Sequence, residues 1–212
     1  MMKMKIAVPM LMMMVGIAQA NLLPNAGFED GTGTLPDGWT GQSYNGGDVA
    51  TDILWMDDAA GAHSGDKYMK LLTNNGSEPY IWPIDLTPVT AGETYDFSVW
   101  AKSTKGDADP PTRTEAFILF YASDQSTYFW EDSPRWQLSP ADVQWPTTWT
   151  KWDIGSWTAP AGAAYVDFNL VSWEGHESGT GLCYDDASIV PEPLTISLLG
   201  LGGLMLRRRR KA

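Results

Sequence analysis

The chain is poor in the residues that cross-link small domains or carry out hydrolysis. Cys183 is the only cysteine among 212 residues, so no disulfide can form within the chain, and a buried structural thiol is its expected role. His63 and His176 are the only histidines, and neither belongs to an HExxH or Gly-x-Ser-x-Gly motif. We therefore expect a fold held together by its core, and no metallopeptidase or serine-hydrolase chemistry.

Residues 1–20 have the pattern of a signal peptide. Lys3 and Lys5 precede an apolar run over 6–17, and Ala18-Gln19-Ala20 fits the small-x-small cleavage rule. The pattern predicts export and a mature chain that begins at Asn21.

The C-terminal segment 191–212 carries a second processing pattern, in which Val190-Pro191-Glu192-Pro193 precedes an apolar run (194–206) and a basic cluster (207–211). The two prolines favour extended backbone, so we expect the folded domain to end at 190. Since a helix needs about 20 apolar residues to cross a bilayer, the run predicts only a short apolar helix, with its basic end on the cytoplasmic side. A C-terminal core helix is the alternative.

These three parts, in this order, resemble the PEP-CTERM sorting signal of Gram-negative bacteria that make exopolysaccharide. The resemblance implies transient insertion into the inner membrane, recognition by an exosortase-type processing protease, and delivery to the cell envelope, cell surface or extracellular matrix. It says nothing about what the domain does there.

The region between the two end segments, 21–190, is strongly acidic. Seven of the 14 basic residues and one of the 26 acidic residues lie in the end segments, which leaves a formal charge of −18 on this region. Such a charge repels nucleic acid and anionic lipid. It is compatible with calcium binding and favours neutral over anionic glycans as partners.

Short runs rich in β-branched and aromatic residues alternate with Gly, Pro, Asn and Asp throughout 21–190. The predicted strands are 21–29, 48–56, 67–73, 80–86, 94–102, 115–123, 148–158, 163–173 and 182–190. This pattern predicts one all-β domain built as a β-sandwich. Two strands alternate cleanly, which places Tyr95, Phe97, Val99 and Ala101, and Val166, Phe168 and Leu170, in the core.

Five stretches of the domain form an ordered set: 21–29 with 35–39, the His-Ser-Gly turn in 62–68, 89–102, 149–162 and 184–189. With these stretches in this order, the domain resembles CenC-type carbohydrate-binding modules, which are jelly rolls of the galactose-binding-like type. Residues 103–146 depart from the family pattern and are rich in Trp, Pro and Asp.

The resemblance also implies a structural calcium site. Calcium prefers six to eight oxygen ligands from carboxylates and backbone carbonyls. The matching positions are the Glu29 carboxylate, backbone oxygens around Gly65 and Lys67, and one of Asp185 or Asp186. The alternative is that these acids are ordinary solvated residues.

All eleven tryptophans lie in 21–190, an excess that suits the apolar faces of sugars. The preferred ligand-binding platform is Tyr165, Asp167, Asn169 and Trp173, with Trp100 on a neighbouring strand. Trp130, Trp136 and Trp145 are second choices, and Trp39, Trp82, Trp149 and Trp157 are expected to be structural.

The sequence thus predicts an exported, non-catalytic glycan-binding β-sandwich. Two alternatives stay open: a structural envelope or biofilm-matrix protein that binds no sugar, and a small polysaccharide lyase or hydrolase.

Overall fold

The computed structural model describes residues 20–74, 76–104, 111–130, 132, 135–138, 146–175 and 180–192. Nearly all of the predicted signal peptide and of the sorting segment lies outside the described residues, as do Trp145 and His176. A compact unit spans Asn21–Glu192. Among the described residues, no helix is long and apolar enough to cross a bilayer.

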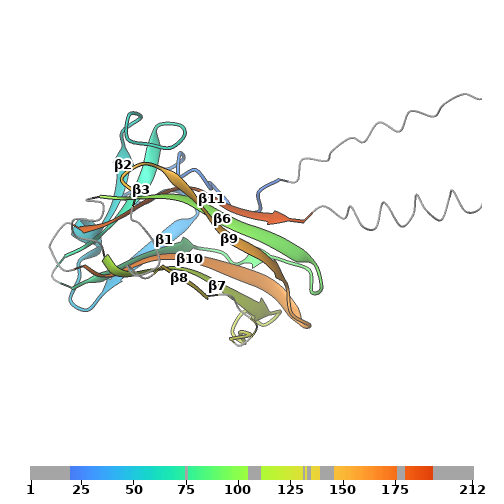
Figure 1. Cartoon of the computed structure of the whole chain (residues 1–212). Coiled ribbons are helices and arrows are strands. Elements are labelled where there is room, and N and C mark those ends of the chain that lie inside the picture. Colours follow the sequence, from blue (N-terminus) through green and yellow to red (C-terminus); the bar gives the residue numbers. More distant parts are fainter. Residues whose placement is uncertain are drawn as a thin grey trace, which may run out of the picture. The chain divides into compact units, whose positions relative to one another are not determined.

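Two antiparallel sheets form a β-sandwich, as the sequence predicts (Figure 1). The first, sheet A, has the order β1-β4-β10-β7-β8, with β5 also paired to β10; the second, sheet B, has the order β2-β3-β11-β6-β9. A single-turn helix, α1, joins β1 to β2. The bounds are β1 Trp39–Tyr44, α1 Val49–Asp52, β2 Ile53–Asp57, β3 Lys67–Thr73, β4 Glu78–Pro83, β5 Thr87–Pro88, β6 Thr94–Ser103, β7 Pro111–Ala122, β8 Arg135–Leu138, β9 Thr150–Thr158, β10 Ala163–Gly175 and β11 Thr180–Pro191.

The core lies between the sheets and follows the alternation of the two clearest strands. The four residues assigned to the core on β6 and the three on β10 are all at most 2% exposed. Phe97 of β6 packs edge-on against Phe120 and Phe168 of sheet A, which joins the two layers. The all-β jelly-roll prediction is confirmed.

The first predicted strand, 21–29, is wrong. Pro24 has no amide hydrogen to donate, and Asn25 and Phe28 have φ values of 42° and 58°, which a strand cannot accommodate. The segment is nevertheless tied to β11, because the Asn21 side chain donates to the Ala187 carbonyl at 2.7 Å and accepts from the Ile189 amide at 3.0 Å. The strands β1, β5 and β8 were not predicted.

The folded unit also extends further than expected at its C-terminal end. Pro191 pairs with Tyr95, and the amide of Glu192 donates to the Thr94 carbonyl at 2.8 Å. Proline can close a strand where its missing amide faces no partner. Strand β11 therefore extends one residue into the Pro-Glu-Pro motif.

Candidate functional site

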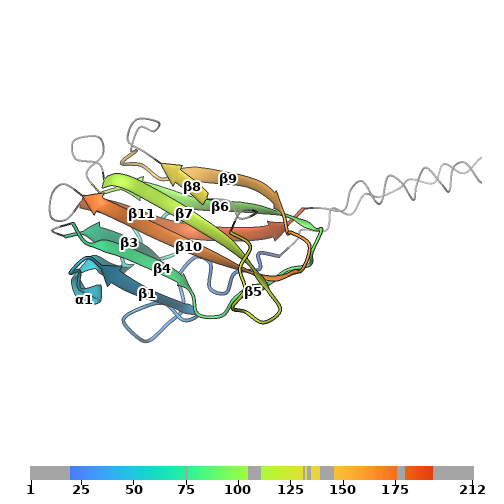
Figure 2. The same cartoon turned by 90° about the horizontal axis from the view of Figure 1, so that it is seen from below.

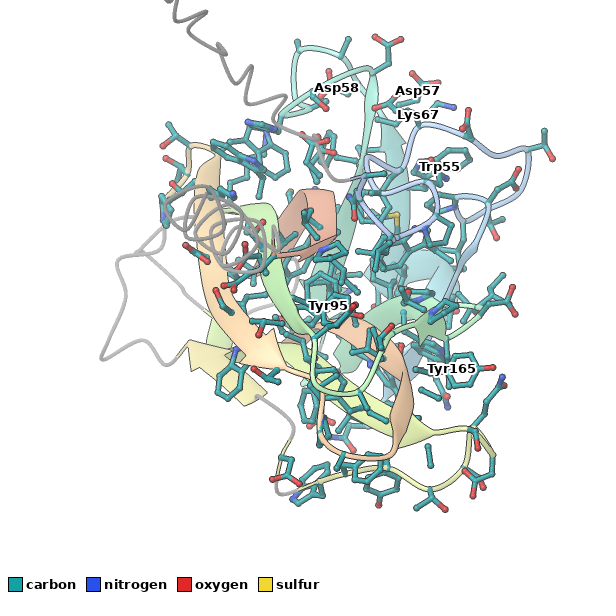
Figure 3. The ribbon with its side chains drawn as sticks, turned by 90° about the vertical axis from the view of Figure 1, so that its right-hand side faces the viewer. Trp55, Asp57, Asp58, Lys67, Tyr95 and Tyr165 are labelled. Carbon is teal, nitrogen blue, oxygen red and sulfur yellow. The ribbon has the colours of Figure 1, made fainter. Side chains whose placement is uncertain are left out.

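The outer face of sheet A is uncovered by other labelled elements when the sandwich is viewed from below (Figure 2). Strand β10 runs through its middle, between β4 and β7. Because Val166, Phe168 and Leu170 point into the core, Tyr165, Asp167 and Asn169 belong to the outer row. Tyr165 is labelled in Figure 3. The structure thus brings together three of the predicted platform residues.

Asp167 is the unusual member of this row. Asp167 is only 8% exposed, and one of its carboxylate oxygens, Oδ1, has no hydrogen-bond partner among the residues that the structure describes. Burial raises the pKa of Asp167 to about 6, although hydrogen bonds from Asn169 and the Phe168 amide oppose the shift. This oxygen is enclosed by the protein, so the lack of a partner makes ionisation of Asp167 unfavourable and does not by itself mark a contact for a ligand.

Three aromatic rings stand on the β1–β4 side of this row. Tyr80 lies opposite Val171 of β10, which places it on the outer face. Its ring is stacked 5.0 Å from that of Tyr44 and 4.7 Å from that of Trp82, with interplanar angles of 12° and 29°. The Tyr80 hydroxyl donates to that of Tyr44. Sequence reasoning missed these two tyrosines and assigned Trp82 a structural role.

A second group of rings stands on the β7 side. Asn169 pairs with Phe117 and Tyr165 with Tyr121, so both rings continue the outer face onto β7. The Tyr128 ring centre lies 6.0 Å from that of Tyr121, and the Trp130 ring centre lies 6.3 Å from that of Phe117. Trp130 was a second choice from the sequence, whereas Tyr128 was not singled out.

Trp173 lies further along the same row of β10, after Val171, and its backbone pairs with that of Arg113. Its side chain lies outside the described part of the structure, as do those of Arg113 and Trp136. Its role in the platform therefore stays a prediction.

The placement of Trp100 beside β10 is wrong. Trp100 is on β6, which pairs with β11 and β9 in sheet B. Its ring is stacked 3.7 Å from the His63 ring, with an interplanar angle of 18°. Alternation within one strand cannot show which sheet that strand joins, and here β6 and β10 lie in opposite layers.

The neighbouring rings of sheet B are likewise occupied within the protein. The Lys102 ammonium lies 4.5 Å from the Trp149 ring and 5.1 Å from the Tyr68 ring. Lys102 Nζ and Trp149 Nε1 both donate to the Gly61 carbonyl, at 2.6 and 2.9 Å. The turn that contains Gly61 is therefore fastened over the outer face of sheet B.

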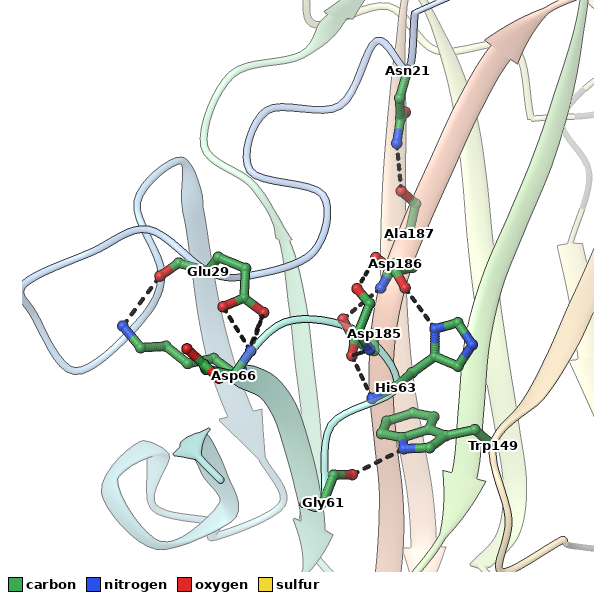
Figure 4. Close-up of polar contacts among 11 residues, drawn as sticks. Asn21, Glu29, Gly61, His63, Asp66, Trp149, Asp185, Asp186 and Ala187 are labelled. Atoms are coloured by element: carbon green, nitrogen blue, oxygen red, sulfur yellow. Dashed lines mark hydrogen bonds and ion pairs between the residues drawn. The ribbon is translucent and has the colours of Figure 1, made fainter. Parts of the chain in front are cut away.

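The same turn is held by Asp185, whose side chain is fully buried (Figure 4). Asp185 Oδ2 accepts the amides of His63 and Ser64 at 2.9 and 3.2 Å, and Oδ1 accepts the amide of Asp186 at 2.8 Å. Burial raises the pKa of Asp185 to about 6, and the Asp186 charge adds to the shift while these amides oppose it. His63 Nδ1 lies 2.6 Å from Asp186 Oδ2.

The Glu29 side chain binds the C-terminal end of the same turn, at Asp66 and Lys67. Its carboxylate accepts the amides of Asp66 and Lys67 at 3.0–3.1 Å. The Lys67 ammonium donates a hydrogen bond to the Glu29 carbonyl at 3.1 Å. The same ammonium lies 4.3 Å from the centre of the Trp55 ring, and Lys67 and Trp55 are neighbours in Figure 3. Gly65 lies between them with φ 58°, and a Cβ there would meet Glu29 Oε1 at 2.2 Å.

The five predicted calcium ligands therefore meet around one turn, but they do not form an oxygen cage. Backbone N–H groups of the turn donate hydrogen bonds to the carboxylates of Glu29 and Asp185 (Figure 4). Calcium prefers six to eight oxygen ligands, so the ion would have to compete with these amides or rearrange the turn. Calcium binding here stays a prediction.

The two acids with raised pKa values do not form a hydrolytic pair. Asp167 lies on the outer face of sheet A, whereas Asp185 holds the turn over the outer face of sheet B. Packed sheets are about 10 Å apart, so the two carboxylates on opposite outer faces are too far apart to flank one glycosidic bond.

Comparison with known proteins finds similar solved structures but no match by sequence. No family model matches the sequence, and no curated protein matches it. Among solved structures, a family 16 carbohydrate-binding module is 20% identical, with a TM-score of 0.53 over 80% of this chain and 99% of that chain. The module TmCBM61, solved in complex with β-1,4-galactotriose, is 14% identical, with a TM-score of 0.55 over 82% of this chain and 99% of that chain.

The enzymatically active domain of bacteriophage CBA120 tailspike protein 4 is a third similar structure, with 18% identity and a TM-score of 0.55 over 81% of this chain but 21% of that chain. At these identities the likeness shows the fold alone. That fold is the galactose-binding-like jelly roll found in carbohydrate-binding modules.

Proposed function

We propose that this chain is a non-catalytic glycan-binding module, and that it binds a neutral polysaccharide on the outer face of sheet A. The observation that carries the proposal is the two groups of aromatic rings on this face, which flank the β10 row that contains Asp167 and Asn169. Sugar hydroxyls donate to a carboxylate, while the C–H faces of a pyranose pack on aromatic rings.

The similar structures support this reading. Two of them are carbohydrate-binding modules matched over 99% of their length, and one of these is complexed with β-1,4-galactotriose. The positions of the raised-pKa acids on opposite outer faces support binding without catalysis. A single site of this kind gives dissociation constants of about micromolar to millimolar, and many copies on one surface raise the avidity.

We further propose that the chain is exported and acts at the cell envelope or in the extracellular matrix. The compact unit starts at Asn21, directly after the expected signal-peptide cleavage site, and ends at Glu192, inside the Pro-Glu-Pro motif. Removal of residues 1–20 and 193–212 would then leave every described strand in place. An exosortase-type protease remains the partner expected from the PEP-CTERM resemblance.

Affinity electrophoresis of the full chain in gels that contain β-1,4-galactan, xylan or polygalacturonate tests the function. We expect a neutral polymer to retard the wild type, polygalacturonate not to, and Asp167→Asn to reduce retardation about tenfold. Asp153→Asn is the control, because Asp153 is exposed on β9 of sheet B. Absence of retardation by every polymer would favour the matrix-protein alternative, and release of sugar ends would favour the enzyme.

A further inference from the structure

The last strand of the sandwich carries the start of the Pro-Glu-Pro motif, which the proposed glycan binding does not use. Pro191 pairs with Tyr95 of β6, and the Glu192 amide donates to the Thr94 carbonyl at 2.8 Å. In an antiparallel ladder, alternate residues direct their N–H and C=O groups to opposite edges of the strand. Since Glu192 faces β6, Pro191 faces the outer edge of β11, where its missing N–H interrupts no pairing with β6.

The N-terminal segment of the domain closes this outer edge of β11. The Asn21 side chain accepts the Ile189 amide at 3.0 Å. It also donates to the Ala187 carbonyl at 2.7 Å (Figure 4). The Leu22 amide donates to the Ile189 carbonyl at 2.9 Å, and the Ala187 amide donates to the Ala26 carbonyl at 2.9 Å. An edge that β3 leaves unpaired is therefore occupied by the start of the same domain.

The backbone donors from 187 to 192 are thus all accounted for within the domain. The outer-edge amides of Ala187 and Ile189 donate to the N-terminal segment, and the alternate amides face β6 in the ladder. Pro191 has no amide hydrogen to donate. A protein that binds an extended segment by strand addition needs free backbone groups along one edge and side chains for its pockets. This stretch offers it no free donor, and the Ala187 and Ile189 side chains are fully buried.

The start of β6, which pairs with the motif, is itself firmly held. The Tyr95 side chain is buried, and its hydroxyl accepts the Thr90 amide at 2.7 Å and donates to the Glu93 carboxylate at 3.2 Å. The hydroxyls of Thr94 and Thr158 lie 2.9 Å apart and tie β6 to β9. Release of the end of β11 therefore requires local opening of the sandwich.

We propose that the folded domain sets its own C-terminal processing boundary, so that a protease that binds extended backbone cuts the chain beyond Glu192 and leaves β11 whole. This inference rests on the proposed processing at the Pro-Glu-Pro motif and is independent of glycan binding. Hydrolysis adds one water across the C–N bond, which leaves a carboxylate on the domain and an amine on the released segment. The first two residues of the motif then serve as the end of a strand.

Digestion of the folded full chain in detergent with proteinase K, followed by intact-mass measurement, tests this boundary. We expect a resistant product whose C-terminal residue is Glu192 or one that follows it. Pro191→Ala separates pairing from the resistance of proline itself: the new amide faces the outer edge, so pairing with β6 and the boundary should both persist. Cleavage between 187 and 192 in the folded wild type, or in folded Pro191→Ala, would overturn the inference.

Asn21→Ala should open the outer edge. We expect cleavage between 187 and 190 to become about tenfold faster, since two hydrogen bonds to β11 are lost. Asn21→Asp keeps the acceptor for the Ile189 amide and should lie between Asn21→Ala and the wild type. Asn25→Gly is the matched control: its side-chain hydrogen bonds do not reach β11, and glycine tolerates the φ of 42°. Equal cleavage rates in Asn21→Ala and Asn25→Gly would contradict the closure of this edge.

Hydrogen exchange of the wild-type chain gives a readout that needs no variant. The amides of Ile189 and Glu192 should be as protected as those of the β6–β11 ladder, and exchange at the rate of an unfolded peptide would overturn the inference. The mass of the chain recovered from a host with an exosortase-type protease separates the two proposals. An uncut chain would refute the proposed processing alone, whereas a C-terminal end within 187–191 would refute the boundary.

Discussion

The outer faces of the two sheets are both rich in aromatic rings, yet they use them differently. On sheet B, Trp100 is covered by an imidazole and Trp149 by an ammonium, and the turn above them is held by a buried carboxylate. On sheet A, Tyr128 and Trp130 are about half exposed, and the buried Asp167 has one oxygen without a partner in the described part of the chain.

This difference shows that a count of rings does not locate a ligand site. Rings whose faces and polar neighbours are satisfied within the protein stabilise the fold, as on sheet B. Exposed rings, as on sheet A, leave surface that another molecule can contact. On the proposed function, the same residue types would serve opposite purposes on two faces of one sandwich.

The largest effect is expected from breaking the contacts of sheet B with its turn. Asp185→Ala removes the acceptor of three backbone amides at a fully buried position, and each orphaned donor is unfavourable. We expect the free energy of unfolding to fall by about 2–4 kcal/mol in denaturant titrations at neutral pH. Asp57→Ala, at an exposed position, is the control; equal stability of the two variants would contradict the role given to Asp185.

Asp167→Asn on sheet A should act in the opposite direction. The folded protein holds a proton on Asp167 up to about pH 6, whereas the unfolded chain loses it near 3.8, so ionisation destabilises the fold above that window. The amide should raise the free energy of unfolding at pH 7 by about 1–3 kcal/mol while it weakens glycan binding.

The pH dependence supplies the check on Asp167. Wild-type stability should fall as pH rises from about 4 to about 6, since Asp167 and Asp185 both have raised pKa values, and Asp167→Asn should lessen that fall. A variant as pH-sensitive as the wild type, or less stable at pH 7, would show that Asp167 is satisfied in solution.

A smaller loss is expected from Lys102→Met, which keeps the apolar stem but removes the ammonium between two rings and its hydrogen bond to Gly61. We expect a loss of about 1–2 kcal/mol in unfolding free energy, with glycan affinity unchanged. Thermal unfolding together with affinity electrophoresis measures both. Weaker glycan binding at unaltered stability would move the ligand site to sheet B.

The smallest effect is expected from chelation. Backbone amides already donate hydrogen bonds to the carboxylates of Glu29 and Asp185. Chelation with EDTA should therefore lower the melting temperature by less than about 2 °C. Stabilisation by several degrees in millimolar calcium would restore the calcium site that the family resemblance implies, with a turn rearranged around the ion.

The strands with clean alternation could be predicted from the sequence, because Phe97 and Phe168 each sit in a local period-2 pattern that needs no knowledge of partners. The strand β1 was missed since Gly41 and Gln42 interrupt its aromatic and β-branched character. Pairing between distant strands decides the site. Trp100 was therefore assigned to the face of the wrong sheet. Tyr128 could be placed on the outer face of sheet A only from its β-bridge to Tyr121.

Hydroxyl-radical footprinting of the wild-type chain, with and without saturating neutral polysaccharide, compares the two sheets directly. Among the described residues, the exposed rings are Tyr44, Tyr128 and Trp130 on sheet A and Trp157 on sheet B. We predict that the polysaccharide protects Tyr128 and Trp130 from oxidation and leaves Trp157 as reactive as before. Protection of Trp157 with unchanged reactivity at Tyr128 and Trp130 would contradict the assignment of the ligand site to sheet A.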